Sequence, residues 1–361
     1  MVAPLRVCYR YRESGGRPNE GDGVKRIVCA AALVMLACYP ATAVADPPQT
    51  LASAAGCGTA AAQPVAVTKV LTIILENTDL GMIIGSPDAP NTNALATACG
   101  LATNYHGIQF PSLPNYLALT SGQVPPAIAG NGNVGIDCQP SPACQSLDPS
   151  IFTQIGTAAA AAPDPATAPT WRSYAESMPA NCGLANSGNY AARHNPAVYY
   201  PNDAAACAEN DVPSGTPAAG ALATDLAAGT LPSYGLFIPN LCNDGHNSCN
   251  GVGRVAEEDA TIASWMPAIL ASPDYQSGHL LVVITADSSS TASNGNTLAT
   301  VLVNPDVVAG TQDATLYTHY SLLRLNEELL GLPLLANAAT ATDMAAGFNL
   351  PLPVAPPPPS P

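Results

Sequence analysis

Ser112 lies in the stretch FPSLPNYLALTSG, residues 110–122, just where an apolar helical run begins. A serine hydroxyl is a weak nucleophile at neutral pH unless a metal ion or a base withdraws its proton. At a helix start it would also have the positive end of the helix dipole behind it, where phosphate oxygens bind favourably. The stretch alone leaves two alternatives open, because an isolated serine at this position can also be a simple helix cap.

Five further residues could supply the chemistry that such a serine needs. They are Glu76, Asn77, Asp244, His246 and Asp287. Each follows a run of apolar residues, and in a mostly parallel sheet functional side chains gather beyond the carboxyl ends of the strands. Carboxylate and amide oxygens are ligands for a hard divalent cation, which can activate a hydroxyl and neutralise a phosphate. These residue types are the ones that a phosphoryl-transfer site requires when lysine and arginine are scarce.

Buried apolar strands alternate with helices along the chain. We expect strands at 67–75, 236–238, 279–285 and 298–303, and helices at 91–104, 112–122 and 320–330. Residues 123–170 are rich in Ala, Pro and Gly and predict an elaborated surface loop with short helices. The alternation predicts an α/β fold, with a mostly parallel sheet covered by helices on both faces.

The N-terminal segment is typical of a secretory signal peptide. Lys25 and Arg26 precede a short apolar run, and an A-x-A site ends at Ala45. We therefore expect residues 1–45 to be an upstream extension plus a cleavable leader, with Val24 as the translation start. A lipoprotein anchored at Cys38 is the alternative. The apolar run is too short for a transmembrane segment. The remaining chain divides into a flexible lead-in at 46–66, one large domain at 67–350 and a disordered proline-rich tail at 351–361.

Charge and cysteine content narrow the function class. Residues 1–45 hold six of the 11 Lys and Arg residues and three of the 26 Asp and Glu residues, so the rest of the chain has five basic and 23 acidic residues. This balance argues against nucleic acid as a partner. Eight cysteines remain, and an even number in an exported chain indicates disulfides. Spacing suggests that Cys138 pairs with Cys144 and Cys242 with Cys249. This leaves Cys182 with Cys207 and Cys57 with Cys99, but spacing does not fix the connectivity.

Five stretches in order resemble a known family. They are LTIILENTDLGMIIGSPDAPNTNALA, PSLPNYLALTSG, YAARHNPAVYY, PNLCNDGH and THYSLLRLNEELLGL. Together they resemble the bacterial phosphoesterase family of secreted acid phosphatases and phospholipases C, in particular the mycobacterial-type acid phosphatases that act on phosphatidylinositol 3-phosphate. The resemblance covers roughly residues 67–348. It implies an alkaline phosphatase-like, three-layer α/β/α sandwich.

The resemblance also implies roles for individual residues. Ser112 falls on the family nucleophile, which becomes transiently phosphorylated. Glu76, Asn77 and Asp287 fall on metal ligands, which implies a divalent cation of unknown identity as cofactor. The predicted substrate-binding residues are Asn115, His194 and Asp244, and the predicted proton-transfer residues are His246 and His319. The implied substrate is a phosphate ester or a phospholipid, with phosphoinositides as candidates, and the implied location is extracellular.

Three positions depart from the family pattern. Phe110 stands where the family has His, Asn247 replaces the last acid of Asp-x-His-Asp, and Ser288 replaces the Glu of Trp-Asp-Glu. A lost carboxylate weakens a hard-cation site. The alternative function is therefore an exported binding protein with a degraded metal site. A serine esterase is not indicated because G-x-S-x-G is absent, and Tyr116 stands where a sulfatase would have Arg. For the enzyme we expect an acidic pH optimum.

Overall fold

The computed structural model describes residues 47–59, 65–131, 134–249, 251–290 and 295–353. The predicted leader and residues 354–361 of the predicted tail lie outside these ranges. None of the helices within them is long and apolar enough to cross a bilayer.

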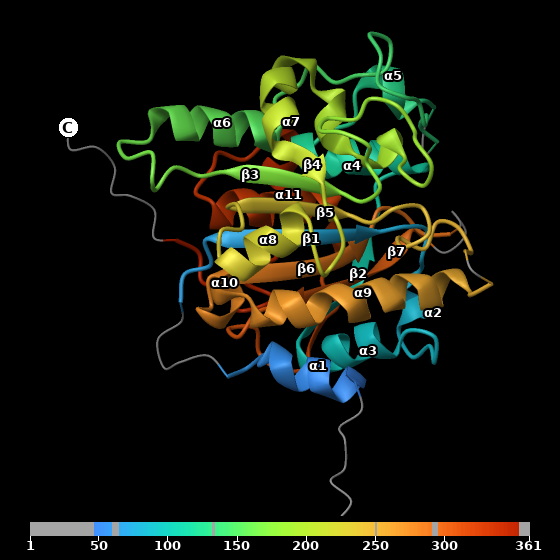
Figure 1. The fold of residues 1–361 in the computed structure, drawn as a ribbon, viewed down its shortest axis with the longest axis vertical. Helices are drawn as coiled ribbons and strands as arrows, with labels where there is room; N and C mark the ends of the chain where they lie inside the picture. Colours follow the sequence, from blue (N-terminus) through green and yellow to red (C-terminus); the bar gives the residue numbers. More distant parts are fainter. Residues whose placement is uncertain (1–46, 60–64, 132–133, 250, 291–294, 354–361) are drawn as a thin grey trace, which may run out of the picture. The chain divides into compact units, whose positions relative to one another are not determined.

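The described strands form one nine-stranded sheet in the order β4-β3-β5-β1-β6-β7-β2-β8, with β9 paired to β2 (Figure 1). The strands are β1 (Lys69–Leu75), β2 (Gly100–His106), β3 (Trp171–Ala175), β4 (Asp211–Pro213), β5 (Tyr234–Ile238), β6 (Leu280–Ala286), β7 (Thr297–Val303), β8 (Thr311–Asp313) and β9 (Tyr317–Thr318). All neighbouring strands pair in parallel except β7, which is antiparallel to both β6 and β2. The prediction of a mostly parallel sheet is confirmed.

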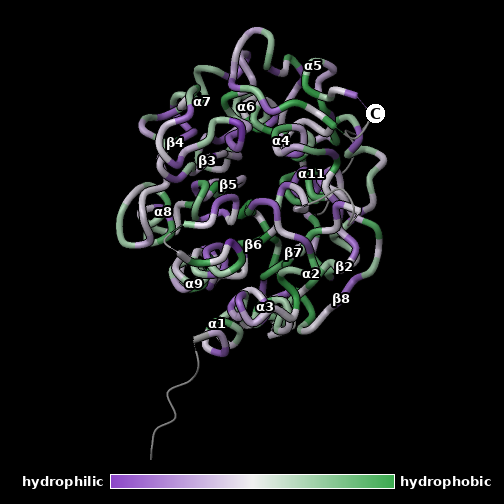
Figure 2. The backbone as a smooth tube through the Cα atoms, turned by 90° about the vertical axis from the view of Figure 1, so that its right-hand side faces the viewer, coloured by the Kyte–Doolittle hydropathy of each residue, from purple (hydrophilic) through white to green (hydrophobic). Residues whose placement is uncertain are grey.

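Helices cover both faces of this sheet, as the end-on view in Figure 2 shows. One layer contains α1 (Pro47–Ala55), α3 (Pro90–Ala98), α8 (Ala221–Ala228) and α9 (Arg254–Ala271); the other contains α4 (Ser112–Ser121), α6 (Ile151–Ala161) and α11 (His319–Leu329). The shorter helices are α2 (Leu80–Ile83), α5 (Pro126–Ala129), α7 (Ala204–Asn210), α10 (Pro273–Gln276) and the 3₁₀ turns η1 (Ala192–His194), η2 (Pro196–Tyr199), η3 (Pro201–Asp203) and η5 (Ala336–Thr340). The arrangement is the predicted three-layer α/β/α sandwich.

The two central strands explain why the acids after them come together. β1 and β6 are almost entirely apolar and are buried along nearly their whole length, which suits strands covered on both faces. They pair in parallel from Lys69 opposite Leu280 to Leu75 opposite Ala286. The residues that follow, Glu76 and Asp287, therefore leave the sheet side by side.

Two sequence predictions of local structure are wrong. The helix predicted over 91–104 ends at Ala98, and Gly100–His106 is β2, because pairing with β7 and β8 places this segment within the sheet. The flexible lead-in predicted for 46–66 is helical over Pro47–Ala55. Leu51 and Ala55 of this helix are buried, and Cys57 is bonded to Cys99, so the segment is attached to the domain.

Four disulfides lie in the described ranges. They join Cys57–Cys99, Cys138–Cys144, Cys182–Cys207 and Cys242–Cys249. These are the pairs that spacing suggested, so the connectivity left open by the sequence is now fixed.

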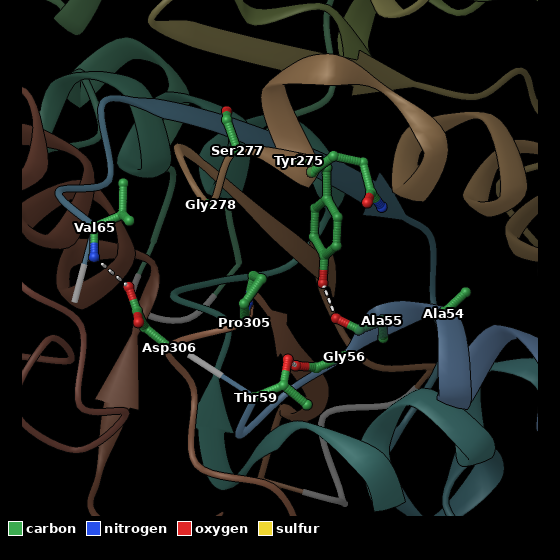
Figure 3. A pocket seen from close by; sticks show the side chains of 11 residues that line it. Ala54, Ala55, Gly56, Thr59, Val65, Tyr275, Ser277, Gly278, Pro305 and Asp306 are labelled. Atoms are coloured by element: carbon green, nitrogen blue, oxygen red, sulfur yellow. Dashed lines mark hydrogen bonds between the residues drawn. The ribbon is translucent and has the colours of Figure 1, made fainter. Parts of the chain in front are cut away.

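A pocket of about 310 Å³ lies at the amino-terminal ends of β1 and β6 (Figure 3). Its polar groups already have partners, since the Tyr275 hydroxyl donates to the Ala55 carbonyl and the Val65 N–H donates to Asp306 at 3.2 Å. These bonds attach the end of α1 and the segment before β1 to the rest of the domain. The candidate catalytic residues lie at the opposite edge of the sheet.

Candidate active site

The carboxyl edge of the sheet brings three acids together. The Asp287 N–H donates to the Leu75 carbonyl at 3.0 Å, and the Glu76 N–H donates to the Asp244 carbonyl at 2.7 Å, so backbone bonds fix all three positions. Glu76, Asp244 and Asp287 are each no more than 1% exposed. The strand-end rule therefore identified residues that do lie together.

Ser112 is the first residue of α4 and faces these acids. Pro111 precedes the helix, and the buried Leu113 and Leu117 hold it against the sheet. The Ser112 hydroxyl donates to Glu76 Oε2 at 3.0 Å, and its interaction with the Asp287 carboxyl partly offsets the rise that burial causes in the pKa of that acid. The structure thus places the predicted nucleophile against two of the three predicted metal ligands, and the roles themselves stay predictions.

Asn77 connects the same two acids. Its backbone φ is 52°, a left-handed conformation that Asn tolerates better than most residues. The Asn77 side chain donates to Glu76 Oε2 at 3.1 Å, and its N–H donates to Asp287 Oδ1 at 3.4 Å.

His194 and the loop after β5 complete the group. His194 lies in η1, 2% exposed, with Nε2 3.2 Å from Glu76 Oε1 and Nδ1 3.3 Å from Asp244 Oδ2. The Cys242–Cys249 disulfide closes the loop, in which Asp244 Oδ1 accepts the His246 N–H at 2.7 Å. Sequence placed His194 in substrate binding, but here it bridges two carboxylates.

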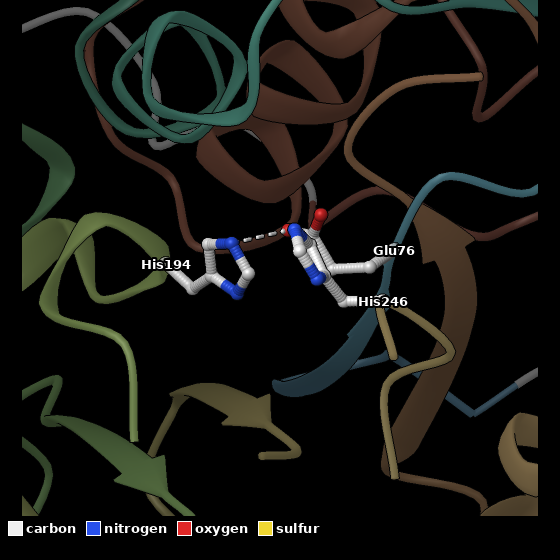
Figure 4. Close-up of side chains that lie close together, drawn as sticks. All are labelled: Glu76, His194 and His246. Atoms are coloured by element: carbon white, nitrogen blue, oxygen red, sulfur yellow. Dashed lines mark ion pairs between the residues drawn. The ribbon is translucent and has the colours of Figure 1, made fainter. Parts of the chain in front are cut away.

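Glu76, His194 and His246 could together hold a metal ion (Figure 4). Each presents a ligand atom, and these atoms all lie within 4.8 Å of one another. His194 Nε2 and Asp244 Oδ2 are buried and make no well-aligned hydrogen bond with any described residue, although they lie 3.2 Å from Glu76 Oε1 and 3.3 Å from His194 Nδ1. A neutral imidazole has only one N–H and can donate to only one of the two carboxylates, so a cation at this point would fit the group.

The electrostatics favour the same conclusion. Burial raises the pKa of Glu76, and the neighbouring charges of Asp287 and Asp244 raise it further. Burial raises the pKa of Asp287 to about 7 and that of Asp244 well above its usual value. Burial also lowers the pKa of His194, so its imidazole is neutral and able to act as a ligand. Several buried carboxylates can all be ionised only if a positive charge compensates them.

Asn115, which the sequence placed in substrate binding, has its polar atoms engaged elsewhere. The Asn115 amide donates to the carbonyls of Gln109 and Pro111, and its oxygen accepts from the N–H groups of Ile108 and Gln109. It therefore organises the loop before α4, and the predicted contact with phosphate is not part of this arrangement.

His319, at the start of α11, lies behind Asp287. Its Nε2 donates to the Asp287 carbonyl at 2.6 Å, and its Nδ1 accepts from the Tyr105 hydroxyl at 2.9 Å. Burial lowers the pKa of His319 to about 4. With both nitrogens engaged and the ring neutral, His319 positions the Asp287 backbone and is poorly placed to transfer a proton to substrate.

The departures from the family pattern do not disrupt the group. Ser288 is buried, and its hydroxyl donates to Asp287 Oδ2 at 3.3 Å. Asn247 supplies the oxygen that accepts from His246 Nδ1 at 2.9 Å, as an aspartate would. Phe110 is half-buried beside α4.

Sequence reasoning missed three residues of this site. Tyr116 donates to Glu76 Oε1 at 2.9 Å and stacks on the His194 ring, and its spacing of one helical turn from Ser112 was an available signal. Arg193 precedes His194 and donates from Nη2 to His246 Nε2 at 3.1 Å. Asp137 pairs with Arg193, and nothing in its local sequence indicated this.

The fold is that of solved structures in the alkaline phosphatase superfamily. A solved structure of a member from Vibrio parahaemolyticus superposes with a TM-score of 0.50 and 10% identity, over 81% of this chain and 78% of that chain. A 2-O GAG sulfatase structure also gives a TM-score of 0.50 and 10% identity, over 81% of this chain and 76% of that one. The chain belongs to the phosphoesterase family, which matches residues 84–333.

Curated relatives agree with this assignment. An acid phosphatase from Aspergillus fumigatus is 27% identical over 74% of this chain and 56% of its own length. A phosphatidylinositol-3-phosphatase from Mycobacterium tuberculosis is 27% identical over 79% of this chain and 84% of its own. A phosphate-repressible acid phosphatase from Penicillium chrysogenum is 28% identical over 74% of this chain and 60% of its own. The chain thus spans little more than half the length of the two fungal relatives.

Proposed function

We propose that this protein is a phosphomonoesterase that uses Ser112 as its nucleophile. The observation on which the proposal depends is the hydrogen bond from the Ser112 hydroxyl, at the start of α4, to the buried carboxylate of Glu76. Membership of the phosphoesterase family and the acid phosphatases among the relatives support this reaction class. The alternative of an impaired binding protein gains no support from Ser288 or Asn247, which both bond to the group.

The chain's own groups can perform both halves of the reaction. Ser112 Oγ attacks phosphorus as its proton passes to Glu76 Oε2, forming an Oγ–P bond while the P–O bond to the leaving alcohol breaks and the alcohol oxygen takes up a proton from solvent. Water then attacks the phosphoserine and releases one proton to solvent, the Oγ–P bond breaks, and the proton on Glu76 returns to Ser112. His246 is half-buried, whereas His319 is fully buried, so His246 could exchange protons with the alcohol or the water once its Nε2 is released from Arg193.

A divalent cation fits the residues present. Glu76, His194 and His246 would hold it, with Asn77 and Asp287 next to Glu76. When bound, the cation supplies charge stabilisation of the phosphoryl group and lowers the pKa of the hydroxyl. Its binding would also compensate the buried acids, which otherwise raise one another's pKa.

The finer proposals concern substrate and location. We propose phosphoinositides as candidate substrates, because one relative is named a phosphatidylinositol-3-phosphatase. We also propose export from the cytoplasm, because four disulfides are typical of proteins that fold in an oxidising compartment.

Hydrolysis of an aryl phosphate in the presence of Mg²⁺, Ca²⁺, Mn²⁺ or Zn²⁺ tests the proposal. We expect Ser112→Ala to reduce kcat by about a thousandfold or more. Acid quenching of the parent should trap a phosphorylated peptide that contains Ser112. Ser121→Ala, at the other end of α4, is the matched control and should retain activity. Turnover that survives in Ser112→Ala would refute the role of the serine.

A further inference from the structure

The carboxylate of Asp137 joins two positively polarised groups at the mouth of the site. Its Oδ1 accepts the Leu113 N–H at 2.9 Å, and its Oδ2 lies 3.2 Å from Arg193 Nε. Asp137 is 56 residues before Arg193 in the chain, so the pair forms only in the folded protein. The Asp137 side chain is 27% exposed and that of Arg193 is 20% exposed.

The two groups held by Asp137 are those that a phosphate on Ser112 would need. Leu113 provides the backbone amide directly after the nucleophile, in the first turn of a ten-residue helix, where anions bind favourably. Arg193 offers a planar fork of donors that suits phosphate oxygens. A carboxylate presents two acceptor oxygens in a similar spacing, so Asp137 occupies the donors as an anionic ligand would.

The position of Asp137 relative to the acid group supports this interpretation. Arg193 also contacts His246, whose ring lies 5.6 Å from the ring of His194. The buried atoms His194 Nε2 and Asp244 Oδ2 belong to the same group and make no well-aligned hydrogen bond within the described ranges, although each lies within 3.3 Å of a neighbouring polar atom of the site. The Asp137 carboxylate therefore stands next to the place where the phosphoryl group would react.

A polar pocket adjoins the pair and gives the carboxylate somewhere to move. It has a volume of about 340 Å³ and is lined by Asp137, Cys138, Gln139, Asn186 and Arg193. Rotation of the Asp137 side chain into this pocket would free the Leu113 amide and the Arg193 guanidinium without unfolding α4.

We propose that Asp137 is an internal competitor of the substrate phosphate. Its carboxylate occupies the Leu113 amide and the Arg193 guanidinium in the free protein, and an incoming phosphate displaces it from both. Arg193 then binds phosphate oxygens, and Asp137 sets how tightly phosphate binds. The inference rests on the proposed function, since it concerns the same site.

Calorimetric titration with inorganic phosphate tests this inference without relying on turnover. The proteins compared are the parent, Asp137→Asn, Arg193→Gln and the double variant, each in the presence of the same divalent cation. Asp137→Asn keeps an oxygen that can accept from Leu113 but removes the charge. Glu328→Gln removes the same charge from the Arg324–Glu328 pair on α11 and is the matched control. Thermal unfolding of each variant checks that the fold is retained.

We expect Asp137→Asn to lower the Kd of phosphate by on the order of tenfold, because a fixed negative charge no longer competes for the donors. Arg193→Gln should raise the Kd, and in that background Asp137→Asn should produce a smaller gain. Glu328→Gln should bind phosphate as the parent does. Unchanged or weaker phosphate binding by a folded Asp137→Asn variant would overturn the inference, because Asp137 would then merely hold Arg193 in place.

The calorimetry also separates this inference from the proposed function. If Ser112 is required for turnover but Asp137→Asn does not bind phosphate more tightly, the inference fails and the proposed function stands. If Asp137→Asn tightens phosphate binding but Ser112→Ala retains turnover, the inference stands and the proposed nucleophile is wrong.

Discussion

Ser288 follows Asp287 at the end of β6, where the family resemblance implies a glutamate. The hydroxyl is buried and within hydrogen-bonding distance of Asp287 Oδ2 at 3.3 Å and Asn77 Oδ1 at 3.5 Å. A glutamate here would add a carboxylate oxygen beside the predicted ligands. At this position the site lacks the charge that the family resemblance implies, and the effect of that charge can be measured.

We expect Ser288→Glu to bind a divalent cation on the order of tenfold more tightly than the parent, because affinity for hard cations rises with the number of charged oxygen ligands. Without a cation the added acid should lower the melting temperature, since it joins carboxylates that already repel one another. Thermal unfolding with and without Mg²⁺ or Ca²⁺ measures both effects. Ser288→Gln is the control, because glutamine has nearly the same volume as glutamate but no charge. Equal cation affinity in Ser288→Glu and Ser288→Gln would contradict the expectation.

The helix that presents Ser112 depends on how it ends as well as on how it begins. Gly122 terminates α4 with φ 73°, and its N–H donates to the Ala118 carbonyl at 3.0 Å. The Gly122 carbonyl in turn accepts from the Asn337 N–H at 3.1 Å. A methyl group at Gly122 would lie 2.6 Å from the Leu335 carbonyl oxygen, so the close approach of these two segments requires glycine.

Gly122→Ala should therefore destabilise the protein by about 2–4 kcal/mol, from left-handed backbone strain together with the collision at Leu335. Gly331→Ala is the matched control, because Gly331 has φ 65° but open space where its methyl group would lie. It should lose only about 1 kcal/mol. Urea unfolding of the two variants gives the free energies, and equal losses would show that the Leu335 contact relaxes freely.

The elements also show which parts of the site the sequence could predict. Apolar, β-branched runs located β1 and β6, and the parallel-sheet rule then placed Glu76 and Asp287 together. The sequence of β2 predicts a helix, because its strand character comes from pairing with β7 and β8, which are distant in sequence. Arg193 and Asp137 could not be predicted for the same reason, since each acts through a partner that only tertiary packing supplies, whereas the helical spacing of Tyr116 from Ser112 was an available signal.

At the scale of the whole molecule, the chain is strongly acidic and buries several acids outside the site. Its formal net charge is −15 at pH 7. Asp211 is fully buried and accepts a hydrogen bond from Asn195 at 2.8 Å, while Glu327 is fully buried and accepts from the Leu335 N–H at 3.0 Å. One carboxyl oxygen of each has no hydrogen-bond partner among the described residues. These two acids lie outside the predicted ligand set, so their titration can be followed without reference to a cation.

Burial raises the pKa of Asp211 from its ordinary 3.8 to about 7 and that of Glu327 from 4.5 to about 8. A raised pKa means that the folded state holds its proton more tightly than the unfolded state, so this contribution to stability is complete below about pH 4 and is lost as pH rises towards 8. We expect the melting temperature to fall by several degrees between pH 5 and pH 8, since each group contributes roughly 1–3 kcal/mol to the loss and repulsion among the acids acts in the same direction.

Glu327→Gln keeps an oxygen that can accept from Leu335 but cannot ionise, so it should match the parent near pH 4 and melt several degrees above it at pH 8.5. Scanning calorimetry across this range measures the difference; a gap that stays constant with pH, or a parent that becomes more stable towards pH 8, would mean that the buried acids do not govern the pH dependence.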